Sequence, residues 1–176
     1  MRLDTNFNIL DTTFFQFSGE RTSAISVTQA ANTDLLVTGT VYWLDTIRQE
    51  RRKGFLAARF DPQLNLKWIK RFHTPSVNGK TVEQQAYHVK EDWYGDILIS
   101  GYRQAIGEDN SLDGLILKLN ASGDLIWKKL IGSPTYDDDI INIEFTPDSV
   151  YFISTSKGVN LFTISPSEIS SRKVNR

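Results

Sequence analysis

Hydrophobic and polar positions repeat along this chain. The segment AISVTQAANTDLLVTG at 24–39 aligns without a gap with AYHVKEDWYGDILISG at 86–101, at an offset of 62 residues. Each copy begins with an alternating stretch, passes through a polar turn, and ends with an apolar run and a glycine. A fixed period of this kind is the sequence signature of a repeat architecture. The chain is therefore expected to fold as copies of one unit.

A second aligned pair lies downstream of the first in each copy. Segment 54–72 matches 113–131 at an offset of 59 residues, and Trp68 falls on Trp127. Weaker copies flank these two: 140–155 with 160–174 on the C-terminal side, and 2–15 on the N-terminal side. The copy at 2–15 resembles 118–131 alone, so it is only half a unit.

Each unit contains four strand-like runs. They are rich in Val, Ile, Leu, Phe, Thr and Trp, which suit a pleated and half-buried surface. Asx, Pro and Gly turns separate them, and a helical period of 3.6 fails along the chain. In the first full copy the predicted strands are 24–30, 35–43, 54–61 and 66–73.

Four antiparallel strands recurring every 50–60 residues favour an all-β fold of β-propeller-like blades. A plain β-sandwich is the alternative. The predicted divisions of this single domain are a half blade at 1–20 and blades at 21–83, 84–138 and 139–176. The repeated tryptophans are expected to fill the space between blades, and Gly39 and Gly101 to occupy crowded positions.

The count of about three and a half blades falls short of the 4–8 blades of closed propellers. Three outcomes stay open. The chain is a piece of a longer propeller, it pairs with itself or another chain, or irregular packing caps its ends. An open array would leave one blade face and one strand edge uncovered at each end.

Composition narrows the possible functions. The 176 residues carry a formal net charge of −1, 40% are hydrophobic, and there is no cysteine. These values are typical of a folded globular protein rather than a disordered one. No basic excess offsets nucleic-acid phosphates, so nucleic-acid binding is not expected. No apolar stretch approaches the length of a membrane span, so no membrane span is expected. No signal peptide is recognisable in residues 1–20, so the cellular compartment stays unknown.

The connections after the second and fourth strands of each unit are predicted to be long, and they share one rim. They cover 44–53, 73–84, 103–112 and 132–139. Long loops on a rigid scaffold are where binding residues concentrate. Loop 44–53 carries Arg48, Arg51 and Arg52, which suggests an anion-binding patch; the alternative is a solvated charged loop.

Aromatic residues near strand ends form a second group of candidates. Trp43, Trp93 and Tyr94 lie outside the repeated Trp position, and Trp93 replaces Ala31 of the first copy. Such side chains could stack on sugars or peptides. The alternative is packing over a neighbouring strand.

The sequence carries only weak indications of a metal site or of catalytic residues. Asp137, Asp138 and Asp139 form the densest carboxylate run, so a Ca²⁺ site is conceivable there, although a strand-entry turn explains it as well. Common nucleophile, phosphate-loop and zinc motifs are absent. The only histidines are His73 and His88, which are expected at ordinary surface or rim positions. The protein is therefore expected to be neither an enzyme nor a cofactor carrier.

A family resemblance rests on DGLILKLNASGDLIWKKLIGSPTYDDD at 113–139. Asp113-Gly114, Lys118-Leu119-Asn120, Gly123, Trp127-Lys128-Lys129, Ile131-Gly132 and Asp137 resemble a bacterial β-propeller repeat family. The first copy departs from this pattern at Gly54, Leu64 and His73. The resemblance implies a secreted or cell-surface protein without enzymatic activity. Segment 119–128 is also similar to the tryptophan-docking repeats of quinoprotein-type propellers, which implies the same general fold but does not imply quinone binding.

Three functional hypotheses follow. The first is a non-enzymatic scaffold or interaction module of a bacterial surface or exported propeller protein. The second is a propeller that binds a protein, peptide or glycan ligand on its long-loop face. The third, a hydrolytic or quinone-dependent enzyme, has the least support in the sequence.

Overall fold

The computed structural model describes residues 2–15, 17, 19–47, 49–74, 82–104, 111–132, 137–146, 151–155 and 158–164. Within these residues the chain is all-β and contains no helix. The strands are β1 (Arg2–Leu3), β2 (Ile9–Asp11), β3 (Arg21–Gln29), β4 (Leu35–Asp45), β5 (Glu50–Phe60), β6 (Leu66–Phe72), β7 (Gln84–Glu91), β8 (Ile97–Gln104), β9 (Leu112–Leu119), β10 (Leu125–Ile131), β11 (Ile140–Phe145), β12 (Tyr151–Thr155) and β13 (Gly158–Ile164).

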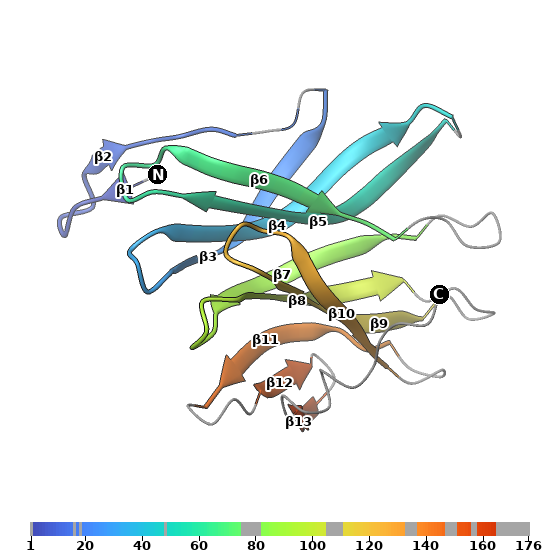
Figure 1. Cartoon of the computed structure of the whole chain (residues 1–176). Helices are drawn as coiled ribbons and strands as arrows, with labels where there is room; N and C mark the ends of the chain where they lie inside the picture. Colours follow the sequence, from blue (N-terminus) through green and yellow to red (C-terminus); the bar gives the residue numbers. More distant parts are fainter. Residues whose placement is uncertain are drawn as a thin grey trace.

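The strands form antiparallel sheets in which sequence neighbours pair. The N-terminal ribbon is β1-β2, the first sheet is β3-β4-β5-β6, the second sheet is β7-β8-β9-β10, and the third sheet is β11-β12-β13. Figure 1 shows the first, second and third sheets following one another as an open stack. No closed ring is formed within the described residues. The four strands predicted for the first full copy match β3 to β6 within a few residues, except at the β4–β5 connection.

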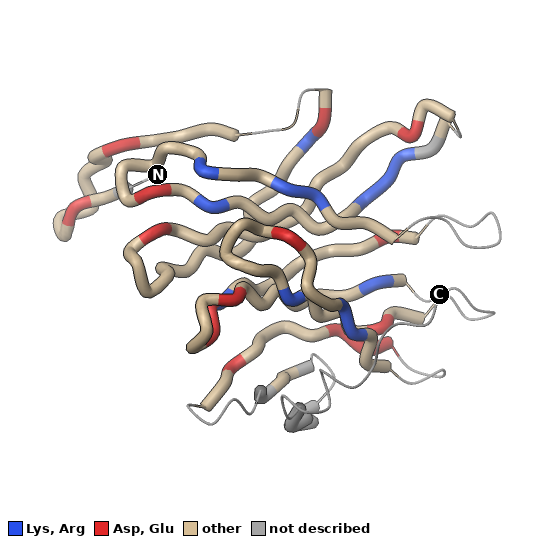
Figure 2. Tube along the Cα trace, viewed as in Figure 1, with Lys and Arg blue, Asp and Glu red and all other residues tan. Residues whose placement is uncertain are grey.

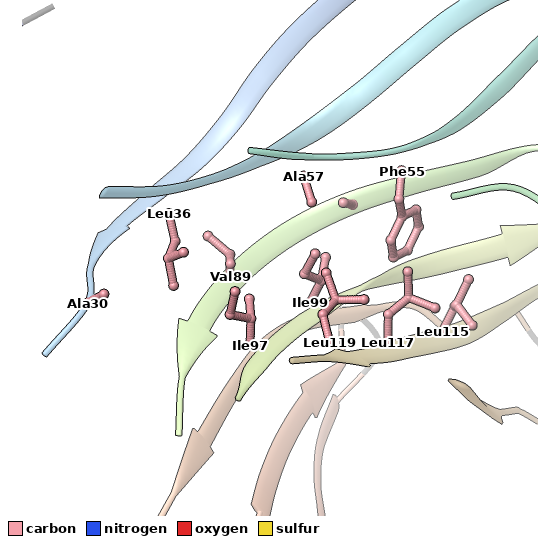
Figure 3. Close-up of a cluster of buried hydrophobic side chains, with 11 residues drawn as sticks. Ala30, Leu36, Phe55, Ala57, Val89, Ile97, Ile99, Leu115, Leu117 and Leu119 are labelled. Atoms are coloured by element: carbon pink, nitrogen blue, oxygen red, sulfur yellow. The ribbon is translucent and has the colours of Figure 1, made fainter. Parts of the chain in front are cut away.

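The sheets pack face to face through apolar side chains. The first strand of each later sheet lies across the preceding sheet, with β7 against β3, β4 and β5, and β11 against β7, β8 and β9. We call the face of the second sheet that carries Val89, Ile97 and Ile99 its leading face. It packs against Leu36 and Phe55 of the first sheet (Figure 3).

The opposite, trailing face of the second sheet makes the next contact. Leu98 and Ile116 lie there and pack against Ile140, Ile143 and Ile153 on the leading face of the third sheet. Each internal contact therefore joins the trailing face of one sheet to the leading face of the next. Alternation of side chains along a strand produces the two faces.

A β-bulge recurs in the first strand of all three sheets. The pairing register shifts between Ala24 and Ser26, between Ala86 and His88, and between Ile140 and Asn142. These are equivalent positions of the sequence repeat. A bulge bends and twists its strand locally, so its recurrence shows that the copies share backbone detail as well as sequence.

Two glycines stand opposite these bulges. A Cβ atom on Gly39 would lie 1.9 Å from the carbonyl oxygen of Ser23, and one on Gly101 would lie 1.9 Å from that of Gln85. Real Cβ atoms do not approach an oxygen so closely. The predicted crowding at Gly39 and Gly101 is confirmed.

The ribbon repeats the outer half of a full sheet. Its turn, in which the Asp4 amide donates to the Asn8 carbonyl at 3.0 Å, matches the turn at Asp61 and the turn at Asn120. Phe7, Leu64 and Gly123 occupy the same place in these three turns with φ of 64°, 66° and 78°. The alignment of 2–15 with 118–131 therefore describes a shared conformation.

Trp68 joins the first sheet to the second. Its indole N–H donates to the carbonyl of Ala121 at 3.1 Å, and its ring packs against the position a Cβ on Gly123 would occupy, at 3.1 Å. Trp127 packs against the core between the second and third sheets. The predicted role of the repeated tryptophans between neighbouring units is confirmed.

A buried ion-pair cluster lies at the β3–β4 turn. Arg59 donates to Asp34 at 2.7 Å and to Glu91 of the second sheet at 3.5 Å, while Lys67 contacts Asp34 at 2.7 Å. Burial favours a higher pKa for Asp34, but hydrogen bonds from Lys67, Arg59 and Asn32 outweigh it and lower the pKa to about 2.

The pair recurs in the second sheet. Lys118 takes the repeat position of Arg59 and contacts Asp92 at 2.8 Å and Asp96 at 2.9 Å. Elsewhere, basic residues lie along β5 and β6, and acidic residues stand mainly near turns (Figure 2). No helix in the described part of the chain is long and apolar enough to cross a membrane.

Candidate functional site

The β4–β5 hairpin is longer than the sequence predicts. Strand pairing runs from Leu35–Phe60 to Asp45–Glu50 without a break, so only 46–49 connect the two strands. The prediction of a long loop over 44–53 is wrong. The charged residues 51–53 suggested a loop, but they lie in a paired strand, where Arg51 is exposed and Arg52 is paired with Asp45.

The end of this hairpin borders an open groove. Opposite Tyr42, β3 has reached its first residue, Arg21, so beyond that point β4 has lost one neighbour. A cavity of about 540 Å³ lies there. Its walls combine aromatic, basic and small polar side chains: Gly19, Arg21, Thr22, Ser23, Tyr42, Trp43, Leu44 and Arg51.

Trp43 is held on three sides. A Cβ on Gly54 would lie 3.2 Å from its ring, so the absence of a side chain there gives the indole room. The His73 ring meets it edge-on at 5.2 Å between centroids, and the Arg71 guanidinium carbon lies 5.2 Å from the ring centre. Arg71 also forms an ion pair with Glu20. The indole is therefore preorganised beside the groove.

Charge around Trp43 is predominantly positive. Arg52 is buried, with 7% of its surface exposed, and donates to Asp45 at 3.0 Å. Burial lowers the pKa of His73, and the positive charges of Arg71 and Arg52 lower it further. The lowered pKa favours the neutral form of His73, and the guanidinium groups supply the cationic character of this region.

Tyr42 connects the groove to the second sheet through a lysine. Lys53 pairs with Tyr42 across the hairpin, and its ammonium lies 6.0 Å from the Tyr42 ring centre. The same ammonium donates to the Tyr102 hydroxyl at 2.9 Å. This contact fixes the wall of the groove relative to the neighbouring sheet.

The predicted site residues do not all gather in one place. Arg51 and Trp43 line the groove, Arg52 lies beside Trp43 and is paired with Asp45, and Arg48 falls outside the described residues. Trp93 and Tyr94 lie in the β7–β8 turn, which corresponds to the β3–β4 turn at the other end of the strands.

Trp93 is used within the fold although 64% of its surface is exposed. Its indole N–H donates to the Thr146 carbonyl at 3.1 Å, and its ring meets Phe145 edge-on at 6.1 Å. Tyr94 lies with its ring centre 5.9 Å from the Lys118 ammonium. Trp93 therefore links the second and third sheets.

The carboxylate run before β11 contacts the second sheet. Asp137 accepts a hydrogen bond from the Leu112 amide at 3.0 Å, and the Asp138 amide donates to the Leu112 carbonyl at 2.5 Å. Among the described residues, no three His, Asp or Glu side chains gather as a metal site. The Ca²⁺ site, which would include Asp139, gains no geometric support and stays a prediction.

His88 differs from its expected surface position. It lies in β7, half-buried, and its Nδ1 atom is buried without a hydrogen-bond partner in the described structure. Burial lowers its pKa. Comparison of the copies could not predict this burial, because the matching residue of the first copy, Ser26, is small and polar.

Three residues of this region were missed from sequence: Arg21, Tyr42 and Arg71. Alternation along the strands was visible, but the register that brings β3, β4 and β6 together was not. Alternate residues of a strand lie on the same face of the sheet. If the register of β5 against β4 and β6 were known, this alternation would place Arg71 on the same face as Arg52 and Trp43.

Comparison with known proteins adds no assignment. No family model matches this chain, and no curated protein matches it significantly.

Proposed function

We propose that this protein is a non-enzymatic interaction module built from β-propeller-type blades. The recurring bulge, the shared turns and the leading-to-trailing packing support a blade identity for each sheet. The sequence resemblance to bacterial propeller repeats supports the same fold and an exported or cell-surface setting. The leading face of the first sheet, where Val27 is 63% exposed, corresponds to an uncovered end of a blade array.

We assign ligand binding to the groove beside Trp43. Aromatic surface next to guanidinium groups suits a ligand that combines a flat or apolar part with carboxylates. An acidic sugar and an acidic peptide segment share this chemistry. Arg21 and Arg51 would face the carboxylates and Tyr42 supplies a stacking surface on their face of the sheet, while Trp43 borders the groove from the opposite face.

One observation carries this assignment: the fold does not require the groove's side chains. At the equivalent positions of the second copy, Arg21 becomes Glu83, Tyr42 becomes Gln104, and Arg51 becomes Asn110. Side chains that serve the common architecture, such as Trp68 and Trp127, recur instead. Residues that build a groove yet are dispensable for the blade are candidates for recognition.

The test is binding to arrays of acidic and neutral glycans and of acidic and neutral peptides. We expect acidic members of one array to bind, and Arg51→Ala and Trp43→Ala to weaken binding about tenfold or more, as central anchors do. Lys128→Gln removes an exposed charge outside the groove and serves as the charge control; Trp93→Ala is the aromatic control.

The salt dependence of binding distinguishes the contribution of the charged side chains from that of the aromatic ones, because added salt screens exposed charges. Binding by the wild type should weaken as salt rises, and binding by Arg51→Ala should depend on salt less. Absence of binding to every acidic ligand, or equal binding by the groove and control variants, would contradict the assignment.

A further inference from the structure

The leading face of the first sheet is only half covered. In the second sheet the leading-face residues Val89, Ile97 and Ile99 are 1%, 1% and 0% exposed. At the equivalent positions of the first sheet, Val27 is 63% exposed, and Leu35 and Val37 are only half-buried. We call Ala24, Val27, Leu35 and Val37 the open strip.

The N-terminal ribbon explains why the other half is covered. Phe15 follows the ribbon and packs on Phe60 of the first sheet, with ring centroids 5.0 Å apart. The Thr22 hydroxyl donates to the Phe15 carbonyl at 3.2 Å. Phe15 takes the repeat position of Ile131, which packs between the second and third sheets. The ribbon thus makes the contact that the outer half of a preceding sheet would make.

A groove of about 370 Å³ remains between this covered part and β3. It is lined mainly by apolar side chains, including Phe15, Ile25, Val27, Leu35 and Val37. The open strip is thus continuous with an interface already made by Phe15 and Phe60. Apolar surface exposed beside such an interface marks a site of further association.

The repeat specifies the chemistry of what fits there. The leading face of the second sheet is covered by the trailing face of the first, through Leu36, Phe55 and Ala57. The leading face of the third sheet is covered by the trailing face of the second, through Leu98 and Ile116. A sheet with a trailing face of this kind is therefore the complement of the open strip.

We propose that a second copy of this chain supplies that sheet: the third sheet of one copy docks on the open strip of another. In the third sheet, Phe152 takes the repeat position of Leu36 and Leu98, and Ser154 takes that of Ser100. These positions correspond to the trailing faces of the first and second sheets.

This contact is heterologous, because it joins two different surfaces of the same chain. Repetition of it either closes a ring or continues as an open assembly. The near-zero net charge of −1 leaves little long-range repulsion between copies. The inference concerns a surface distinct from the ligand groove beside Trp43, so either can fail without the other.

Size-exclusion chromatography with light scattering at rising protein concentration tests the association. We expect the wild type to exceed the 20.0 kDa of one chain, and Val27→Lys to stay at that mass. Ile126→Lys is the matched control: Ile126 is 50% exposed on β10, and the first copy carries Lys67 at that position. It should associate like the wild type. A monomeric wild type, or a Val27→Lys protein that still associates, would overturn the proposal.

Disulfide trapping tests the direction of the contact, since the chain has no native cysteine. Val27→Cys and Ser154→Cys proteins are mixed under oxidation. Mixed disulfides in excess over the two homodimeric products are expected. A predominance of the Val27→Cys homodimer, or no cross-link at all, would rule out docking by the third sheet. Matching thermal unfolding of the variants and the wild type verifies that each is folded.

Discussion

Asp34→Asn is expected to lower the free energy of unfolding by about 2–3 kcal/mol, because it breaks a buried charge cluster. The Asp34 side chain is 3% exposed and the Arg59 side chain 8%. Asn keeps nearly the same volume and removes only the charge. The change therefore isolates electrostatics from packing.

The magnitude follows from the pKa of Asp34. Folding lowers this pKa from 3.8 to about 2, and one unit corresponds to about 1.4 kcal/mol, so the ionised carboxylate contributes about 2 kcal/mol. Arg59 then keeps only the 3.5 Å contact to Glu91 as an ion pair, which adds to the loss. Broken buried pairs typically cost about 3–5 kcal/mol, which bounds the effect from above.

Urea unfolding at neutral pH measures the difference, and a thermal shift of several degrees should accompany it. Asp61→Asn is the matched control. Asp61 accepts hydrogen bonds from the amides of Gln63 and Asn65 at 2.9 Å in an exposed turn. It lacks the buried Arg59 partner of Asp34, so its replacement should cost clearly less.

The pH dependence provides a second measurement. A carboxyl whose pKa is lowered by folding stabilises the protein above its unfolded pKa, and this contribution disappears as the pH falls through the folded value. The gap between the wild type and Asp34→Asn should therefore narrow between about pH 4 and pH 2. A gap that stays constant there, or a loss no larger than that of Asp61→Asn, would refute the reasoning.

Two packing predictions concern the contacts within and between sheets. Gly101→Ala should prevent stable folding, because its Cβ would lie 1.9 Å from the Gln85 carbonyl oxygen; circular dichroism would show this, and a folded Ala variant with unchanged stability would contradict it. Trp68→Ala should cost about 3 kcal/mol in a urea titration, because it removes inter-sheet packing and the hydrogen bond to Ala121. Trp93→Ala, whose ring is mostly exposed, should cost less, and equal losses would be inconsistent with the assigned role of Trp68.

Much of the architecture could be predicted because backbone geometry and sequence repeat together. Gly39 and Gly101 mark the close approaches at the bulges, and Trp68 and Trp127 mark contacts between sheets. Alternation located the strands to within a few residues. These signals are local, so a single sequence carries them.

The sequence does not predict contacts that depend on strand register and on the packing of one sheet against another. Arg52 looked like a solvated loop residue, but pairing with Asp45 lets it lie in a strand with little exposure. The hydrogen bond from the Trp93 indole to the Thr146 carbonyl, which follows β11, was not predicted either. Neither partner can be read from nearby sequence, because strand register and sheet stacking bring them into reach.

The matching of leading and trailing faces has a consequence for how such a protein changes length. A unit whose two faces complement each other can be added or removed by duplicating or deleting one stretch of chain, without redesigning either neighbour. The contacts that each added unit makes with its neighbours then offset the conformational entropy that the unit loses on folding. Adaptation is confined to residues beyond the packed parts of these faces, such as Trp43 and Arg51, where copies are free to diverge.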